Sequence, residues 1–158
     1  MLEWLENTQF ADWVREDLWG WPVALTLHAF GTALVVGFVL IIGLRLLGFF
    51  KMIPYTSLNR MFPVIWAALL LQLLSGFTLW VSKPTRYVAD GAFMLKSSLI
   101  VVGIILTLQF YRTINHEAAS WEVQGAVSAR GVRFVTAALL VWGGVLVAGR
   151  LTGYLGSI

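Results

Sequence analysis

Long apolar runs, almost free of charge, dominate the pattern of hydrophobic and polar positions along this chain. They extend over about 22–47, 63–81, 92–111 and 132–154. An α-helix needs roughly 20 residues to cross the hydrocarbon of a bilayer, and backbone groups in lipid must be satisfied within a helix or a closed barrel. The runs lack the alternation of membrane β-strands. The pattern predicts an all-α integral membrane four-helix bundle, with residues 1–158 as a single domain.

The first 20 residues have a different pattern, in which apolar and acidic positions repeat at helical period. The apolar side is formed by Leu2, Leu5, Phe10, Trp13, Val14, Leu18 and Trp19, opposite Glu3, Glu6, Asp12, Glu16 and Asp17. This predicts an amphipathic helix over 2–18 that lies in the membrane interface. A signal peptide would begin with basic residues instead of these acids. An aromatic belt is expected at Trp19, Trp21, Trp80 and Tyr154.

Composition agrees with a membrane protein and narrows the chemistry. The chain is 59% hydrophobic and 12% charged, whereas soluble domains carry about 25% charged residues. Cysteine is absent, which excludes disulfides, thiolate metal sites and thiol nucleophiles. The net charge is +3 without a long basic cluster, so the expected partner is the lipid bilayer and not nucleic acid.

The positive residues predict an orientation. Six of them flank the first and third connections between the runs, at Arg45, Lys51, Arg60, Arg112, Arg130 and Arg133. The same regions hold two acids, Glu117 and Glu122, whereas the opposite ends combine Arg15, Lys83 and Arg86 with six acids. Because cytoplasmic loops are enriched in Lys and Arg, both termini are predicted on the outer side of the membrane.

In that orientation, polar residues of all four runs fall in the outer half. His28 lies about 9 Å below the outer interface at ~1.5 Å per residue, and Lys96 lies about one turn into the third run. Arg150 lies near the outer end of the fourth run, with Tyr154 four residues later on the same face. Gln72 is one of three polar residues of the second run that can face inward, with Ser75 and Thr78. No carboxylate lies within the runs, so the set predicts a site for an anionic or metal-bearing ligand.

Each of these residues also has an ordinary structural interpretation. Lys96 and Arg150 can extend to the interface, and Gln72 can simply hydrogen-bond to a neighbouring helix. A single histidine such as His28 is often a core residue. The small residues around Gly149 and along the fourth run equally suit close helix packing.

The cofactor interpretation is haem b or a quinone. His28 would be the axial metal ligand of a haem, with Arg150, Lys96 or Arg86 on the propionates. A quinone would be held by His28 and Arg150. The other histidine, His116, lies near the opposite membrane face, so both histidines cannot hold one haem in one chain. A haem bound to His28 could take Met94 as its second axial ligand, stay five-coordinate, or be shared between two chains.

Two arginines in the runs lead to opposite expectations. Arg150 stands between Gly149 and Gly153, where close helix approach predicts burial with a partner. Arg45 stands on the cytoplasmic side near Lys51, where it can extend to anionic lipid. Substitutions at Arg150 are therefore expected to be the more harmful.

Four segments carry a resemblance to known proteins: "LHAFGTALVVGFVLIIGLRLLG", "KPTRYVADGAFMLK", "NHE" and "AGRLTGY". From Trp21 onward the chain resembles an uncharacterised bacterial family of four-helix inner-membrane proteins, which implies the bacterial inner membrane. The resemblance places six residues in motif positions: His28, Arg45, Arg86, Lys96, His116 and Arg150. More distantly, the first run is similar to copper-resistance membrane proteins and b-type cytochrome bundles.

Three functional classes follow from the sequence. The first is a redox or ligand-binding membrane protein. The second is a non-catalytic accessory or anchoring subunit of a larger membrane complex or homo-oligomer, and the third is a small transporter. The sequence contains no triad, phosphate loop or His/carboxylate cluster, so it does not decide whether the protein is an enzyme.

Overall fold

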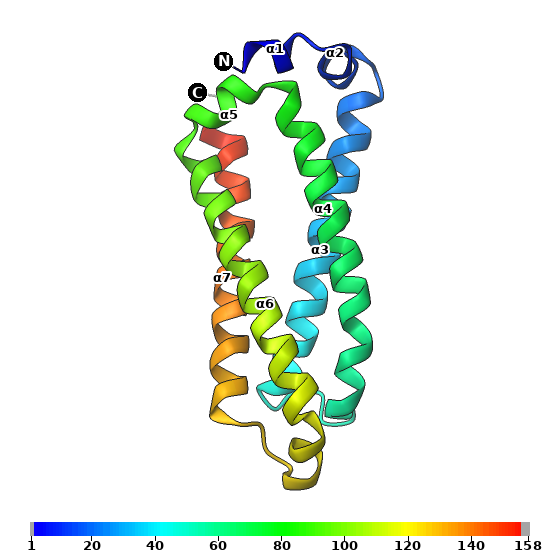
Figure 1. Cartoon of the computed structure of the whole chain (residues 1–158), viewed down its shortest axis with the longest axis vertical. Helices are drawn as coiled ribbons and strands as arrows, with labels where there is room; N and C mark the ends of the chain where they lie inside the picture. Colours follow the sequence, from blue (N-terminus) through cyan, green and yellow to red (C-terminus); the bar gives the residue numbers. More distant parts are fainter. Residues whose placement is uncertain (1, 156–158) are drawn as a thin grey trace.

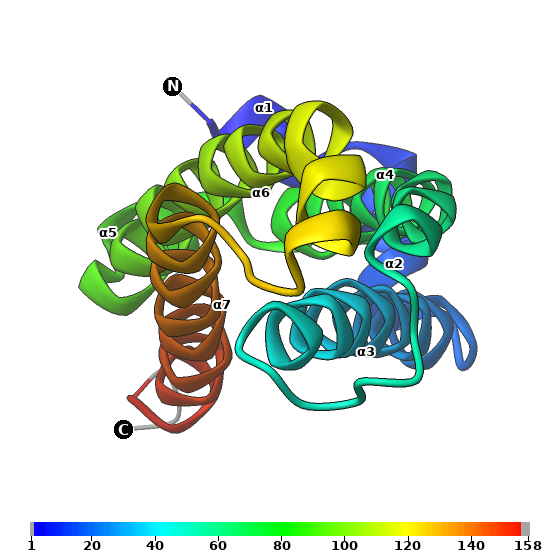
Figure 2. The ribbon, with the colours of Figure 1, turned by 90° about the horizontal axis from the view of Figure 1, so that it is seen from below.

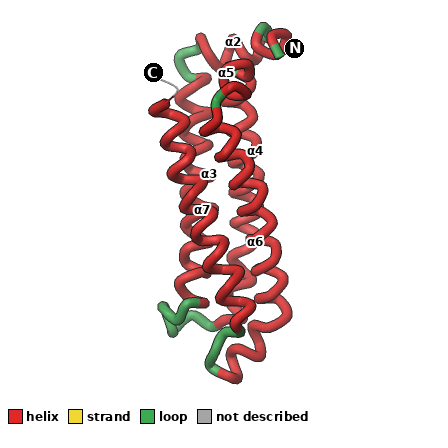
Figure 3. The backbone as a smooth tube through the Cα atoms, turned by 90° about the vertical axis from the view of Figure 1, so that its left-hand side faces the viewer, coloured by secondary structure: helices red, strands yellow, loops and turns green. Residues whose placement is uncertain are grey.

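The structure, a computed structural model, describes the backbone of residues 2–155 and the side chains of residues 2–151. The described residues form helices joined by turns, without strands. Figure 3 shows the connections confined to the two ends of the molecule. In chain order the elements are α1 (Glu3–Glu6), α2 (Gln9–Glu16), α3 (Gly20–Leu46), η1 (Tyr55–Met61), α4 (Phe62–Ser82), α5 (Pro84–Ala89), α6 (Gly91–Gln124) and α7 (Ala129–Leu155).

Four segments are long and apolar enough to cross a membrane. They are Gly20–Leu46, Tyr55–Ser82, Gly91–Gln124 and Ala129–Leu151, with mean hydropathies between 1.8 and 2.3. Each contains one of the predicted apolar runs, apart from the last residues of the first and fourth runs. The prediction of an all-helical chain with four segments that could span a membrane is confirmed, and these segments suggest a multi-pass membrane protein.

The long helices pair in chain order and run side by side (Figures 1 and 2). α3 packs along α4 and α6 along α7, while α3 also contacts α7. We name the end with α1, α2 and α5 the cap end, and the opposite end the loop end. The two pairs join in the half near the loop end, and they diverge toward the cap end (Figure 1). The buried core accordingly gathers large side chains from the loop-end halves of the helices, including Val39, Ile42, Phe62, Ile65, Phe110, Ile114 and Val135.

α6 continues past the predicted end of the third run at Tyr111. It reaches Gln124 because Ile114, Ala118 and Trp121 recur at helical spacing and are buried beside η1. Trp121 meets the ring of Tyr55 edge-on. The continuation therefore supports the first connection and lies outside the most apolar part of the helix.

Arg45 is buried at the loop end, which corrects the expectation that it extends to lipid. Its side chain is 5% exposed. Its Nε donates a hydrogen bond to the Ile53 carbonyl, and its guanidinium lies 3.7 Å from the centre of the Tyr55 ring. The backbone N–H groups of Tyr55 and Thr56 donate to the Glu122 carboxylate, at 2.7 and 3.4 Å. The connection folds back over the end of α3, so Arg45 has partners within the protein.

The cap end contains two short helices instead of the predicted single helix over 2–18. The chain turns between them at Thr8, whose hydroxyl donates to the Leu5 carbonyl and accepts from the Ala11 N–H at the start of α2. This N-cap starts a new helix in a new direction. Ala11 and Val14 are buried, because α2 packs on the ends of α3 and α4.

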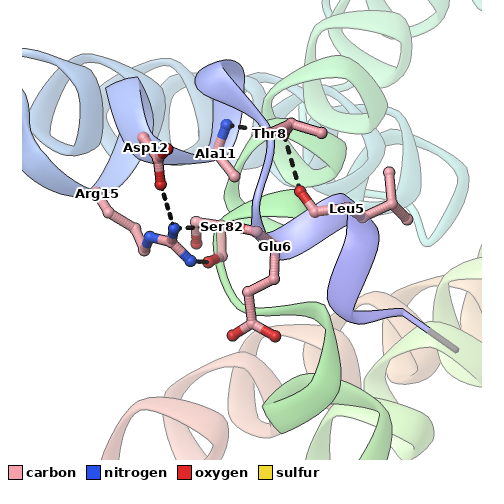
Figure 4. A network of polar contacts seen from close by, with 7 residues as sticks. All are labelled: Leu5, Glu6, Thr8, Ala11, Asp12, Arg15 and Ser82. Atoms are coloured by element: carbon pink, nitrogen blue, oxygen red, sulfur yellow. Dashed lines mark hydrogen bonds and ion pairs between the residues drawn. The ribbon is translucent and has the colours of Figure 1, made fainter.

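A polar network ties α1 and α2 to the connection between α4 and α5 (Figure 4). Arg15 donates to the Asp12 carboxylate, to the Ser82 carbonyl at 3.0 Å and to the Glu6 carbonyl at 2.7 Å. The Glu6 carboxylate accepts a hydrogen bond from the Thr85 hydroxyl at 2.6 Å. Arg15 and Glu6 thus hold α5 in place over the cap end.

Candidate functional site

A cavity of about 770 Å³ opens at the cap end, where the two helix pairs diverge. α3 contributes Trp21, Leu25 and His28, and α7 contributes Gly149. The other walls belong to α4, α5, α6 and the short connections between them. They include Gln72, Leu73, Phe77, Trp80, Lys83, Arg86, Tyr87, Asp90, Phe93, Met94, Lys96 and Ser97.

A chain of hydrogen bonds joins α3 to α4 at the deep end of the cavity. His28 Nδ1 lies 3.2 Å from Ser75 Oγ, and His28 Nε2 lies 3.0 Å from Gln72 Nε2. The Thr32 hydroxyl lies 2.8 Å from the His28 carbonyl oxygen and 3.0 Å from Gln72 Oε1, and its one proton can serve either acceptor. Gly76 leaves room for the imidazole, because a Cβ there would lie 3.1 Å from His28 Cε1.

The directions of these bonds define the tautomer of His28. The Ser75 hydroxyl donates to the Leu71 carbonyl at 2.7 Å, so Ser75 Oγ accepts from the proton on His28 Nδ1. In this neutral imidazole Nε2 carries the lone pair and accepts from the Gln72 amide nitrogen.

This arrangement does not suit His28 as an axial haem ligand. Iron binding requires a ring nitrogen with a free lone pair, and the lone pair on His28 Nε2 already accepts the Gln72 N–H. A haem would have to displace Gln72 and break its contact with Thr32. Separately, no group of three or more His, Cys, Asp or Glu side chains that could hold a metal ion is found among the described residues, a search that does not concern haem, whose iron takes one or two protein ligands.

Lys96 provides a donor on the opposite wall. The Lys96 side chain lies against Gly149 of α7. A Cβ added at Gly149 would lie 3.6 Å from Lys96 Cε and 3.7 Å from Lys96 Nζ. Within the described part of the chain, no hydrogen bond or ion pair involves Lys96. An ammonium group beside apolar walls favours a ligand that accepts hydrogen bonds or carries negative charge.

Charged and aromatic residues of α5 and its flanks line the cavity at the cap end. Burial raises the pKa of the Tyr87 phenol above its ordinary value, an effect that Arg86 opposes and Asp90 strengthens. The phenol therefore stays protonated near neutral pH and can donate a hydrogen bond. Its ring packs on Phe93, with centroids 5.3 Å apart.

The structure brings together four of the predicted site residues and separates a fifth. His28, Gln72, Lys96 and Arg86 line the same cavity. Arg150 is exposed and lines a separate surface pocket on α7, with Leu146, Val147 and Leu151. The structure does not bring Arg150 into this cavity, because Gly149 occupies the inward position and the next residue of the helix is turned away. Tyr154 lies outside the side chains that the structure describes.

The remaining candidates are placed as follows. Met94 lines the cavity, whereas His116 is exposed on the loop-end part of α6. Sequence reasoning missed the aromatic walls that Phe77, Tyr87 and Phe93 provide. The sequence does show aromatic residues clustered around the connection between the second and third runs. Of these, only Trp80 was assigned a role, as part of the interfacial aromatic belt.

Comparison with known proteins does not identify a relative: no family model, curated protein or solved structure matches the chain. The resemblance to a bacterial inner-membrane family stays a prediction. Function must therefore be argued from the cavity itself.

Proposed function

We propose that this protein binds a quinone in the cavity at the cap end, with the quinone ring between the aromatic walls. The observation that carries the proposal is a cavity of about 770 Å³ with largely apolar and aromatic walls, a few polar groups at its deep end and charged residues at the cap end. Small-molecule sites typically have volumes of about 300–1,000 Å³ and this kind of lining. Phe77, Trp80 and Phe93 supply flat apolar surfaces beside the ring.

The unused donors of the cavity match the acceptors of a quinone. The Lys96 ammonium has no protein partner among the described residues, and one Gln72 N–H remains after the bond to His28. Each can donate to a quinone carbonyl oxygen. His28 then acts through Gln72, as a positioning residue whose Nε2 orients the amide, and haem is the less suitable cofactor because it needs that nitrogen.

Titration with a short-chain ubiquinone analogue in nanodiscs tests the proposal. Quinones quench nearby indole fluorescence, and Trp21 and Trp80 line the cavity. We expect Lys96→Met to raise the Kd at least about tenfold, since a hydrogen bond to a charged group contributes roughly 1.5–3 kcal/mol and about 1.4 kcal/mol is a tenfold change in Kd. Lys51→Met, which alters an exposed lysine of the first connection, should leave the Kd unchanged.

The histidines form a second matched pair. His28→Ala should weaken binding because Gln72 loses its orienting acceptor, while His116→Ala should not. Equal effects within either pair would contradict a quinone at this site. A Soret band in the purified protein that disappears in His28→Ala would instead favour haem.

We also propose a four-helix bundle in a bacterial inner membrane, with α1 and α2 in the outer interface. The excess of Lys and Arg at the loop end supports a cytoplasmic loop end. A reporter that is active only outside the cytoplasm should be active after Ile158 and silent when inserted within residues 52–59. The reverse pattern would overturn the orientation without affecting the cavity.

A further inference from the structure

The side of the cavity between α4 and α6 is open toward the surroundings of the helices. α4 packs on α3 and α2, while α6 packs on α7 and η1, and α4 and α6 have little direct contact. Leu73 and Phe77 of α4 and Met94 of α6 line the cavity. The same three side chains are 51%, 56% and 55% exposed, so they border an opening and are not part of a closed core.

The opening has the chemistry of the lipid phase. Leu73, Phe77 and Met94 are apolar, and both helices belong to segments that can span a membrane. A gap with apolar borders at this level would face acyl chains and not water.

The cap end has a different lining. α5 lies at this end (Figure 1), and the cavity is lined here by Arg86 and Tyr87 of α5 and by Lys83 just before it. It is held there by the bonds from Thr85 to Glu6 and from Arg15 to the Ser82 carbonyl. None of the described residues of α1 and α2 lines the cavity, but Arg15 of α2 holds the end of α4 just before α5 through the Ser82 carbonyl (Figure 4).

We infer that the ligand enters from the bilayer through the side opening between α4 and α6, and that its hydrophobic tail remains in this opening while its head reaches Lys96 and Gln72. The inference rests on the proposed function and specifies the ligand as a lipid-soluble molecule with a long chain, such as a prenylated quinone. In this proposal α5, which is tied to α1 by Thr85 and Glu6, restricts access from water at the cap end.

The absence of cysteine allows a direct test, because one introduced thiol is the only site for a maleimide. Ser97→Cys places a thiol of similar size on the cavity wall, and Met52→Cys places one in the first connection, where Met52 is 97% exposed. Each variant is treated in nanodiscs with a lipophilic maleimide or with a membrane-impermeant sulfonated maleimide. Relative to Met52→Cys, the sulfonated reagent should modify Ser97→Cys at least about tenfold more slowly, and the lipophilic reagent should modify it readily.

Two adjacent leucines provide the matched control for the route. Leu73 lines the opening, whereas Leu74 is exposed elsewhere on α4 and does not line the cavity. Leu73→Trp should slow modification of Ser97→Cys by the lipophilic maleimide several-fold, and Leu74→Trp should not. The double variant Glu6→Gln, Thr85→Val should accelerate the sulfonated reagent, because α5 loses its tie to α1.

The result separates the route from the identity of the ligand, because labelling requires no quinone. Modification of Ser97→Cys by the sulfonated reagent as fast as Met52→Cys would overturn entry from the bilayer. Equal rates for Leu73→Trp and Leu74→Trp, or no modification by either reagent, would overturn it as well. If the labelling shows the expected pattern but the quinone titration fails, the quinone is refuted as the ligand and the route from the bilayer stands.

Discussion

Arg45→Gln is expected to lower the free energy of unfolding by about 3 kcal/mol, combining a charged hydrogen bond of roughly 1.5–3 kcal/mol with a cation–π contact of about 0.5–2 kcal/mol. The Arg45 side chain is buried between the Ile53 carbonyl and the Tyr55 ring. Its loss should release the first connection from α3. Thermal or SDS unfolding of the detergent-solubilised protein measures the change.

Arg150→Gln is the matched control, because Arg150 is also on a long apolar helix. Its side chain is exposed beside Leu146 and Leu151, and surface substitutions usually change stability by less than about 0.5 kcal/mol. The larger loss of stability is thus expected at Arg45, whereas the sequence alone predicts the larger loss at Arg150. A larger loss at Arg150 than at Arg45 would restore the sequence-based expectation and contradict the packing described for both ends.

Gly31→Leu is expected to cost about 3 kcal/mol, at the upper end of the usual range for overpacking. A Cβ at Gly31 would lie 3.0 Å from Gln72 Oε1, 3.2 Å from Gln72 N and 3.3 Å from the Ala68 carbonyl oxygen. The last two atoms belong to the backbone of α4, so a larger side chain must separate α3 from α4. The stability measured by unfolding in detergent should fall, and the affinity for quinone should fall as well because Gln72 is displaced from His28.

Gly37→Leu on the same helix is the control. Apart from its chain neighbours and the nearby backbone of α3 itself, nothing lies within 4 Å of a Cβ at Gly37, and leucine has a better helix propensity than glycine by up to about 1 kcal/mol. Stability should be unchanged or slightly increased. Equal losses at both glycines would mean that α3 and α4 do not approach at Gly31 as described.

The candidate site was predictable in part. His28, Gln72 and Lys96 could be grouped from sequence because depth along a membrane helix follows directly from the position in an apolar run. Depth does not specify which face of the helix a residue occupies. Arg150 has a suitable depth but lies on the exposed face of α7, whereas Gly149 lines the cavity.

The sequence by itself determined that the chain is helical and where its four apolar segments lie, because hydrocarbon imposes internal hydrogen bonding on every long apolar run. Tertiary structure decided how those helices pair, since apolar residues cover all faces of a membrane helix and give little periodicity to identify the buried one. It buried Arg45 by folding the first connection over α3. It also separated α4 from α6 and so created the cavity, a consequence of contacts between distant segments that no local pattern encodes.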